Sequence, residues 1–210
     1  MCVFVDSGAS VFKYNDLEKC WVDVGLWEDH FPDEPRPFGN REVWGGYDPA
    51  RSGDTSAFAI LAPPSVPGER FRVLAVYYWQ GMAWKHQAKK IQELYSRYRF
   101  THIGIDTTGI GHGVYEMVQD FAPRETMEIR YSLSMKTQLV LKMVDLVDEE
   151  RIEWDREQKE ITASFLAIRR DTTSKGGAMT FVADRSMETG HADSFWAIAH
   201  GAINEPLNTD

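Results

Sequence analysis

The sequence contains few cysteines and lacks long apolar runs. Its 210 residues include only Cys2 and Cys20, which form no metal-spacing motif. A disulfide between them is not expected in a reducing compartment. No apolar run is long enough to span a bilayer, and the N-terminus lacks the basic-then-apolar pattern of a signal peptide. We therefore expect a cytoplasmic protein with no membrane partner.

Basic residues are also in the minority. The chain has 23 Lys and Arg against 32 Asp and Glu, a formal net charge of -9. This balance argues against a protein that coats nucleic acid through bulk electrostatics. A nuclease stays open, because clustered carboxylates that bind metal ions make the net charge negative while a local basic face still holds phosphates. The 43% hydrophobic content and seven Trp are enough for the core of one domain.

A proline-rich stretch divides the chain. Residues 31–39 (FPDEPRPFG) place three prolines within a short span, which favours an extended, semi-rigid linker. We therefore expect residues 1–40 to be a lead-in segment and linker without chemistry of its own. Residues 41–210 are expected to form the functional domain.

From residue 41 onward the apolar pattern predicts a mixed α/β sheet flanked by helices. Three strands joined by short turns form an antiparallel meander, after which helices and strands alternate. Ser134 is expected to cap the helix that contains Leu139 and Val147. The predicted strands are 43–48, 57–62, 71–79, 101–106, 127–131, 152–154 and 179–183. The predicted helices are 84–98, 114–121, 139–147, 161–169 and 192–203.

Three aspartates stand at the ends of these predicted elements. Asp48 ends the first strand, Asp106 ends the fourth strand and Asp193 opens the last helix. If the two strands are parallel neighbours, their ends are close, and a terminal helix packed on the sheet adds the third carboxylate. Three converging carboxylates repel one another unless a cation neutralises them, and Mg²⁺ and Mn²⁺ prefer hard oxygen ligands. Two such ions about 4 Å apart suit in-line displacement at a phosphodiester.

Plain structural explanations compete with this hypothesis. Asp48 and Asp106 both precede turn-forming residues, and Asp193 fits a helix N-cap. The pattern alone therefore leaves the metal site and the structural explanation evenly matched. The predicted helix over 84–98 also has a basic face, for which ordinary solvation is favoured over DNA contact. That face consists of Lys85, Lys89, Lys90, Arg97 and, just beyond it, Arg99.

Three stretches around the aspartates resemble the motifs of one protein family. They look like the acidic motifs of the C-terminal nuclease domain of the large terminase subunit of tailed bacteriophages, most like the P2-type group. The likeness covers nearly all of residues 41–207, in the expected order. The three stretches are 44–54 (WGGYDPARSGD), 103–111 (IGIDTTGIG) and 191–197 (HADSFWA). Further similar segments are 71–74 (FRVL), 140–142 (VLK), 164–169 (SFLAIR) and 204–207 (NEPL).

The resemblance implies an RNase H-like fold with a mixed five-stranded sheet. It implies a metal-dependent endonuclease that cuts double-stranded viral DNA concatemers during genome packaging, by two-metal phosphodiester hydrolysis. Carried over by position, Asp48, Asp106 and Asp193 are the catalytic residues and the ligands of two Mg²⁺ or Mn²⁺ ions. Some relatives have Glu at the second position, so the shorter Asp106 demands a closer metal. Asp54 and His191 lie inside the motifs and are candidates for supporting contacts only.

The same resemblance implies partners and one departure from the family pattern. In the full assembly the partners are the terminase ATPase domain, the small terminase subunit and the portal, in the cytoplasm of the bacterial host. A complete large terminase has a phosphate-binding loop, whereas no G-x-x-x-x-G-K-[ST] pattern occurs in this sequence. We therefore expect an isolated nuclease domain that does not translocate DNA alone. Candidate contacts to the phosphate backbone are Lys136, Lys142 and Arg185.

Two other function classes stay open. Residues 48–55 (DPARSGDT) and 106–111 (DTTGIG) also resemble the phosphate loops of actin- and sugar-kinase-like ATPases, which have a related core. Those proteins are longer and have a duplicated domain, so this chain is short for one. The other class is a non-catalytic DNA- or portal-binding domain with degenerate acids, against which three intact aspartates argue.

Overall fold

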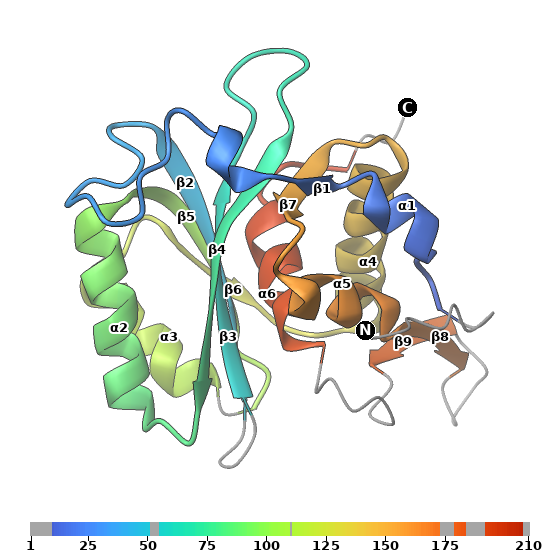
Figure 1. Cartoon of the computed structure of the whole chain (residues 1–210). Helices are drawn as coiled ribbons and strands as arrows, with labels where there is room; N and C mark the ends of the chain where they lie inside the picture. Colours follow the sequence, from blue (N-terminus) through green and yellow to red (C-terminus); the bar gives the residue numbers. More distant parts are fainter. Residues whose placement is uncertain (1–9, 51–54, 110, 173–178, 184–191, 208–210) are drawn as a thin grey trace.

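The computed structural model describes residues 10–50, 55–109, 111–172, 179–183 and 192–207. Within these residues, a seven-stranded sheet has the order β1-β7-β4-β3-β2-β5-β6, and a two-stranded sheet pairs β8 with β9. Helices cover both faces of the large sheet, with α2 and α3 on one face and α4, α5 and α6 on the other (Figure 1). In the described part of the chain, no helix has the length and apolar character needed to cross a bilayer.

Five consecutive strands of the large sheet match strands that the apolar pattern predicts. β2 (Glu42–Asp48), β3 (Thr55–Ala62) and β4 (Phe71–Gln80) pair antiparallel as a meander. β5 (Arg99–Asp106) runs parallel to β2, and β6 (Thr126–Ile129) runs parallel to β5. Such strands have few polar positions because helices bury both of their faces. The expected mixed α/β sheet is confirmed, but among the described residues it has seven strands and not the five that the resemblance implied.

Four short strands extend this arrangement. β7 (Ile152–Asp155) pairs parallel with β4, and β1 (Trp21–Val22) pairs parallel with β7. β8 (Ile168–Thr172) and β9 (Met179–Ala183) form the separate antiparallel pair. The prediction of a helix over 161–169 is therefore wrong for its last residues. The helix, α5, finishes before the fully buried Ile168, which starts β8.

The large sheet separates the hydrophobic core into two parts, each covered by helices. One part lies under α2 (Trp84–Arg97) and α3 (Gly111–Gln119). The other lies under α4 (Leu133–Asp148), α5 (Lys159–Leu166) and α6 (Asp193–Ala202). Buried side chains of the first part include Tyr47, Phe58, Ile91 and Ile103, and those of the second include Leu61, Trp154, Phe165 and Phe195.

The start of α4 differs from the expected cap. The hydroxyl of Ser132, not that of Ser134, accepts a hydrogen bond from Met135 N at 3.0 Å. The helix therefore begins earlier than its apolar stripe, because a first turn without a buried residue (Leu133 to Lys136) precedes the residues that enter the core. This extra turn carries Lys136, which becomes important for the site.

The leading segment packs on the sheet. It contains α1 (Tyr14–Glu18), β1 and a short 3₁₀ turn, η1 (Val24–Leu26). Phe12, Leu17 and the free Cys20 are buried, and Trp21 Nε1 donates a hydrogen bond to Thr162 Oγ1 at 3.0 Å. We therefore propose that residues 10–40 fold together with the domain.

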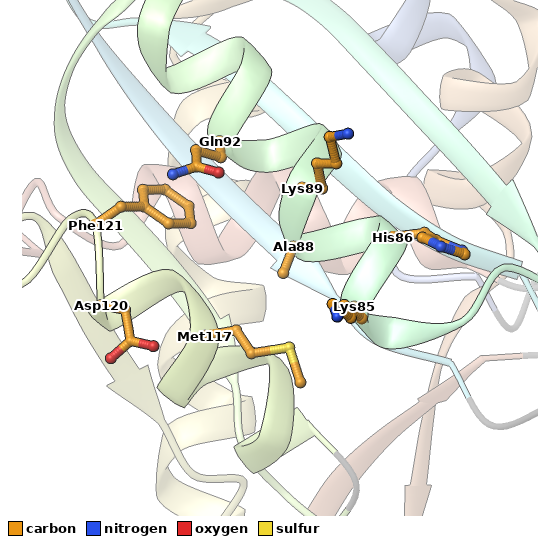
Figure 2. Close-up of a pocket in the computed structure, with 8 residues that line it drawn as sticks. All are labelled: Lys85, His86, Ala88, Lys89, Gln92, Met117, Asp120 and Phe121. Atoms are coloured by element: carbon orange, nitrogen blue, oxygen red, sulfur yellow. The ribbon is translucent and has the colours of Figure 1, made fainter.

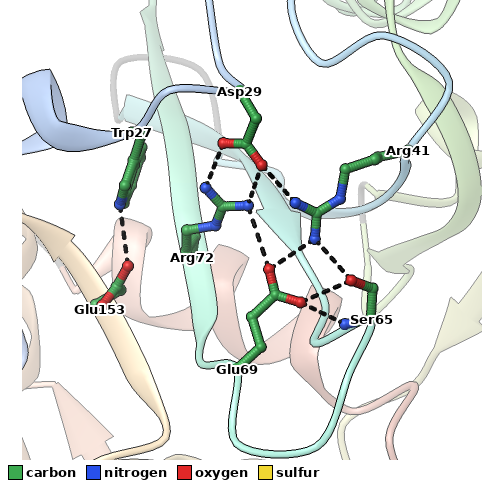
Figure 3. A network of polar contacts seen from close by, with 7 residues as sticks. All are labelled: Trp27, Asp29, Arg41, Ser65, Glu69, Arg72 and Glu153. Atoms are coloured by element: carbon green, nitrogen blue, oxygen red, sulfur yellow. Dashed lines mark hydrogen bonds and ion pairs between the residues drawn. The ribbon is translucent and has the colours of Figure 1, made fainter.

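An ion-pair network holds the end of this segment to β4 (Figure 3). Arg72, a buried residue of β4, donates to Asp29 Oδ1 at 2.7 Å and to Oδ2 at 2.9 Å. Arg41 donates to Glu69 Oε1 at 2.7 Å and also contacts Asp29. Hydrogen bonds from Arg72 are the main cause that lowers the pKa of Asp29 to about 2. Burial raises the pKa of Glu69, but hydrogen bonds from Arg41 and Ser65 outweigh it and bring that pKa to about 2.

Candidate functional site

Two of the three predicted site residues end neighbouring strands. β2 and β5 run parallel with Tyr47 paired to Ile105, and the next residue on each strand is Asp48 or Asp106. The carboxyl ends of parallel neighbours meet at one edge of a sheet, which is where open α/β sheets bind ligands. The adjacency that the site hypothesis required of these two strands is therefore confirmed.

Glycines in the sheet allow α6 to approach this edge. A Cβ atom added to Gly46 would lie 1.8 Å from Ala197 O, and one added to Gly104 would lie 2.3 Å from His200 O. Any larger residue would therefore push the helix backbone away. Because Ala197 lies over Gly46 while Gly201 approaches Gly45 and Gly46, α6 runs antiparallel to β2. Its first residue, Asp193, consequently lies at the same end of β2 as Asp48.

The charges of the other two aspartates act on Asp48. Burial raises the pKa of Asp48 well above its ordinary value, and the charges of Asp193 and Asp106 raise it further. The Lys136 ammonium acts in the opposite direction. Burial also raises the pKa of Asp106, although Thr108 N donates to its Oδ1 at 2.8 Å and, like Lys136, lowers that pKa.

The donor chemistry of these residues fits a divalent cation. Three carboxylates offer only hard oxygen ligands, and their mutual repulsion is relieved by positive charge. As the side chains stand, however, no group of three or more His, Cys, Asp or Glu among the described residues is arranged to hold a metal ion. The charges of Asp106 and Asp193 thus act on Asp48, but the described side chains are not arranged as a complete set of metal ligands.

A buried hydrogen-bond chain, which sequence reasoning did not find, lies directly behind Asp48. His200 Nδ1 is 3.0 Å from Tyr47 O, and Tyr131 Oη is 2.7 Å from His200 Nε2. Burial lowers the pKa of His200 to about 3, so its ring is neutral. A backbone carbonyl only accepts hydrogen bonds, so Nδ1 carries the proton and Nε2 accepts from the Tyr131 hydroxyl. The sequence did hold one signal for His200. It follows Asp193 and Trp196 at helical intervals, which places the three residues on one side of α6.

The three candidate phosphate contacts lie in different environments or outside the described residues. Lys136 lies in the first turn of α4, with Nζ 5.2 Å from the Tyr131 ring centroid. Lys142 is only 1% exposed and donates to Glu205 Oε2 at 2.9 Å and to Pro206 O at 3.2 Å, so its ammonium serves a structural ion pair. The expectation that it touches DNA is therefore wrong. Arg185, Asp54 and His191 lie outside the described residues.

A separate open groove lies between α2 and α3 (Figure 2). Its volume is about 650 Å³, and it contains none of the three aspartates. Figure 2 shows the side chains that face it, which come from α2, from α3 and from the two residues that follow α3. They are Lys85, His86, Ala88, Lys89, Gln92, Met117, Asp120 and Phe121.

Comparison with known proteins gives a consistent result. The family described as "Terminase RNaseH-like domain" matches residues 45–205. The chain is 48% identical over 210 residues to the "Probable terminase, ATPase subunit" of Haemophilus phage HP1 (strain HP1c1), covering 100% of this chain and 34% of that protein. It is 46% identical over 208 residues to the "Terminase, ATPase subunit" of Escherichia phage P2, covering 99% of this chain and 35% of that protein. The chain thus spans about a third of the length of these curated relatives.

A solved structure shares the fold. The large terminase nuclease from thermophilic phage G20c with bound magnesium superimposes with a TM-score of 0.71 at 20% identity. The match covers 94% of this chain and 98% of that chain. At this level of identity, the likeness shows a common architecture.

Proposed function

The chain belongs to the terminase RNase H-like domain family, and from that premise we propose that it is a metal-dependent endonuclease that cuts double-stranded viral DNA concatemers during genome packaging. The observation that carries the proposal is the placement of Asp48 and Asp106 at adjacent ends of parallel strands, with Asp193 acting electrostatically on Asp48. The G20c nuclease structures with bound magnesium and cobalt support the use of a divalent ion.

In the proposed mechanism, Asp48, Asp106 and Asp193 would hold two Mg²⁺ or Mn²⁺ ions. Such ions, when bound, lower the pKa of a water molecule and stabilise the leaving oxygen of a phosphodiester. The chain contributes the positions of the ligands. The ends of β2 and β5 determine the positions of Asp48 and Asp106. The close packing of α6 on Gly46 and Gly104 determines the position of Asp193. The neutral His200 and the Tyr131 hydroxyl hold the backbone carbonyl before Asp48 in place.

We further propose that the domain works with a terminase ATPase domain, a small terminase subunit and a portal in the cytoplasm of an infected bacterium. The names of the HP1 and P2 relatives support the first of these partners. Double-stranded DNA is the proposed substrate.

Incubation with supercoiled plasmid in Mg²⁺, Mn²⁺ or EDTA tests the proposal. We expect nicked and linear products only with metal, and loss of cleavage in Asp48→Asn and Asp193→Asn. Asp155→Asn is the matched control, because Asp155 ends β7, away from the site, and should cleave like the wild type. Cleavage in EDTA, or full activity of Asp48→Asn, would overturn the assignment. ATP turnover without cutting would favour the actin- and sugar-kinase-like class, and DNA binding without either activity would favour the non-catalytic class.

A further inference from the structure

Two aromatic rings hold the side chain of Lys136 beside the candidate site. Lys136 Nζ lies 5.2 Å from the ring centroid of Tyr131 and 5.7 Å from that of Trp196. The two rings pack against each other with centroids 5.5 Å apart. An ammonium over aromatic faces is attracted by their quadrupoles. A long and flexible side chain is thereby held between one ring from the loop before α4 and one ring from α6.

Each ring is connected to one of the aspartates. Tyr131 N donates to Thr108 Oγ1 at 2.9 Å, and Thr108 N donates to Asp106 Oδ1 at 2.8 Å. Trp196 lies on α6 three residues after Asp193, so both are on the same side of the helix. Lys136 is therefore located by contacts that lead to Asp106 through one ring and to Asp193 through the other.

Hydrogen bonds also connect the Tyr131 ring to the end of β2. Its hydroxyl lies 2.7 Å from His200 Nε2, and His200 Nδ1 lies 3.0 Å from the carbonyl oxygen of Tyr47, the residue before Asp48. The ammonium that this ring holds therefore lies beside the edge of the sheet where the carboxylates stand. A divalent ion on these carboxylates would repel the ammonium. An ammonium beside such ions is suited to an anionic partner, and lysine binds phosphate as a point charge.

We propose that Lys136 contacts the scissile phosphate of bound DNA, and that Tyr131 and Trp196 position its ammonium for that contact. The inference rests on the nuclease function proposed above and adds a substrate-binding residue to it. The alternative is that Lys136 only neutralises Asp48 and Asp106 in the folded protein. The two roles differ in what happens when the charge is removed and metal is supplied in excess.

Lys136→Gln and Lys136→Arg separate these roles. If Lys136 binds phosphate, Lys136→Gln should cleave DNA at least about tenfold more slowly than the wild type at saturating Mn²⁺. Enzymes that lose one hydrogen-bond donor to a charge developing in the transition state slow by at least this much. Lys136→Arg keeps the charge and should retain most of this activity. Calorimetric titration with Mn²⁺ alone should show binding to Lys136→Gln that is as tight as in the wild type or tighter, because a like charge has been removed. Lys85→Gln, an exposed lysine of α2, is the matched control and should change neither property.

A further readout is binding of a DNA duplex in Ca²⁺ in place of Mn²⁺. We expect Lys136→Gln to bind more weakly than Lys85→Gln, and both variants to melt within a few degrees of the wild type. Cleavage by Lys136→Gln at the wild-type rate in saturating Mn²⁺ would overturn this inference and leave the nuclease proposal standing. Weaker Mn²⁺ binding by Lys136→Gln would also overturn it, since the lysine would then support the ligand geometry. A wild type that fails to cleave would overturn the nuclease proposal and this inference with it.

Discussion

The contact between α6 and the sheet can be tested with a single methyl group. In Gly46→Ala the new Cβ would lie 1.8 Å from Ala197 O and 2.5 Å from Gly201 N, both backbone atoms of α6. Real Cβ contacts are essentially never closer than 3.0 Å, so the helix must move by more than an ångström. Overpacking typically costs about 1–3 kcal/mol, and a rigid backbone obstacle places this variant near 3 kcal/mol. For a domain of this size, that is a fall in Tm of roughly 6–12 °C.

Gly113→Ala is the matched control for this change. Gly113 lies in α3, and an added Cβ would meet only the Trp84 ring, at an ordinary 3.7 Å. Alanine favours a helix over glycine by about 0.8–1 kcal/mol, so this variant should melt at or a few degrees above the wild-type Tm. Scanning calorimetry measures both. A Gly46→Ala protein that melts within about 2 °C of the wild type would refute the close seat of α6.

The same variant connects the fold to the site. A displaced α6 carries Asp193 with it, so folded Gly46→Ala should bind Mn²⁺ more weakly than the wild type at a temperature well below its Tm. Calorimetric titration of the folded fraction measures this effect apart from unfolding. Unchanged Mn²⁺ affinity in a destabilised Gly46→Ala would show that the position of Asp193 does not depend on the glycine seat.

Three further predictions concern other charges. Because the pKa values of Asp29 and Glu69 are lowered to about 2, their stabilisation is complete above the unfolded pKa values near 4 and is lost as the pH falls toward 2. Urea unfolding from pH 5 to 2 should show this loss, and Arg72→Met should flatten it. Lys142→Ala should cost about 2–4 kcal/mol in urea unfolding, since it leaves a partner carboxylate without its buried ammonium. Asp48→Asn should melt higher than the wild type in EDTA, because it relieves carboxylate repulsion, yet lose the gain of about 3 kcal/mol that Mn²⁺ at 100 times Kd gives the wild type.

Local sequence pattern was sufficient for the elements that place the site. Strands with continuous apolar residues, such as Ala57–Ala62, and the change to helical spacing after Trp84 are visible within a short window. Aspartates at the ends of such strands could be identified for the same reason. The parallel pairing of β2 with β5 was only a condition of the site hypothesis, and the structure supplies it.

Features that depend on distant partners could not be predicted. β1 is two residues long and forms only because β7, far along the chain, offers an open edge. Lys142 was expected to contact the phosphate backbone, but its ammonium pairs with Glu205, which lies 63 residues later in the chain. The contact of Lys136 with the ring of Trp196 likewise joins α4 to α6, two helices that are close only in the folded chain.

The central claim is that Asp48, Asp106 and Asp193 converge on divalent metal. Anomalous diffraction from crystals soaked in Mn²⁺ tests it most directly. We predict manganese at the ends of β2 and β5, with carboxylate oxygens of all three aspartates within about 2.5 Å of an ion. Absence of manganese at this edge in soaked crystals, or an ion bound by only one of the three carboxylates, would contradict the account.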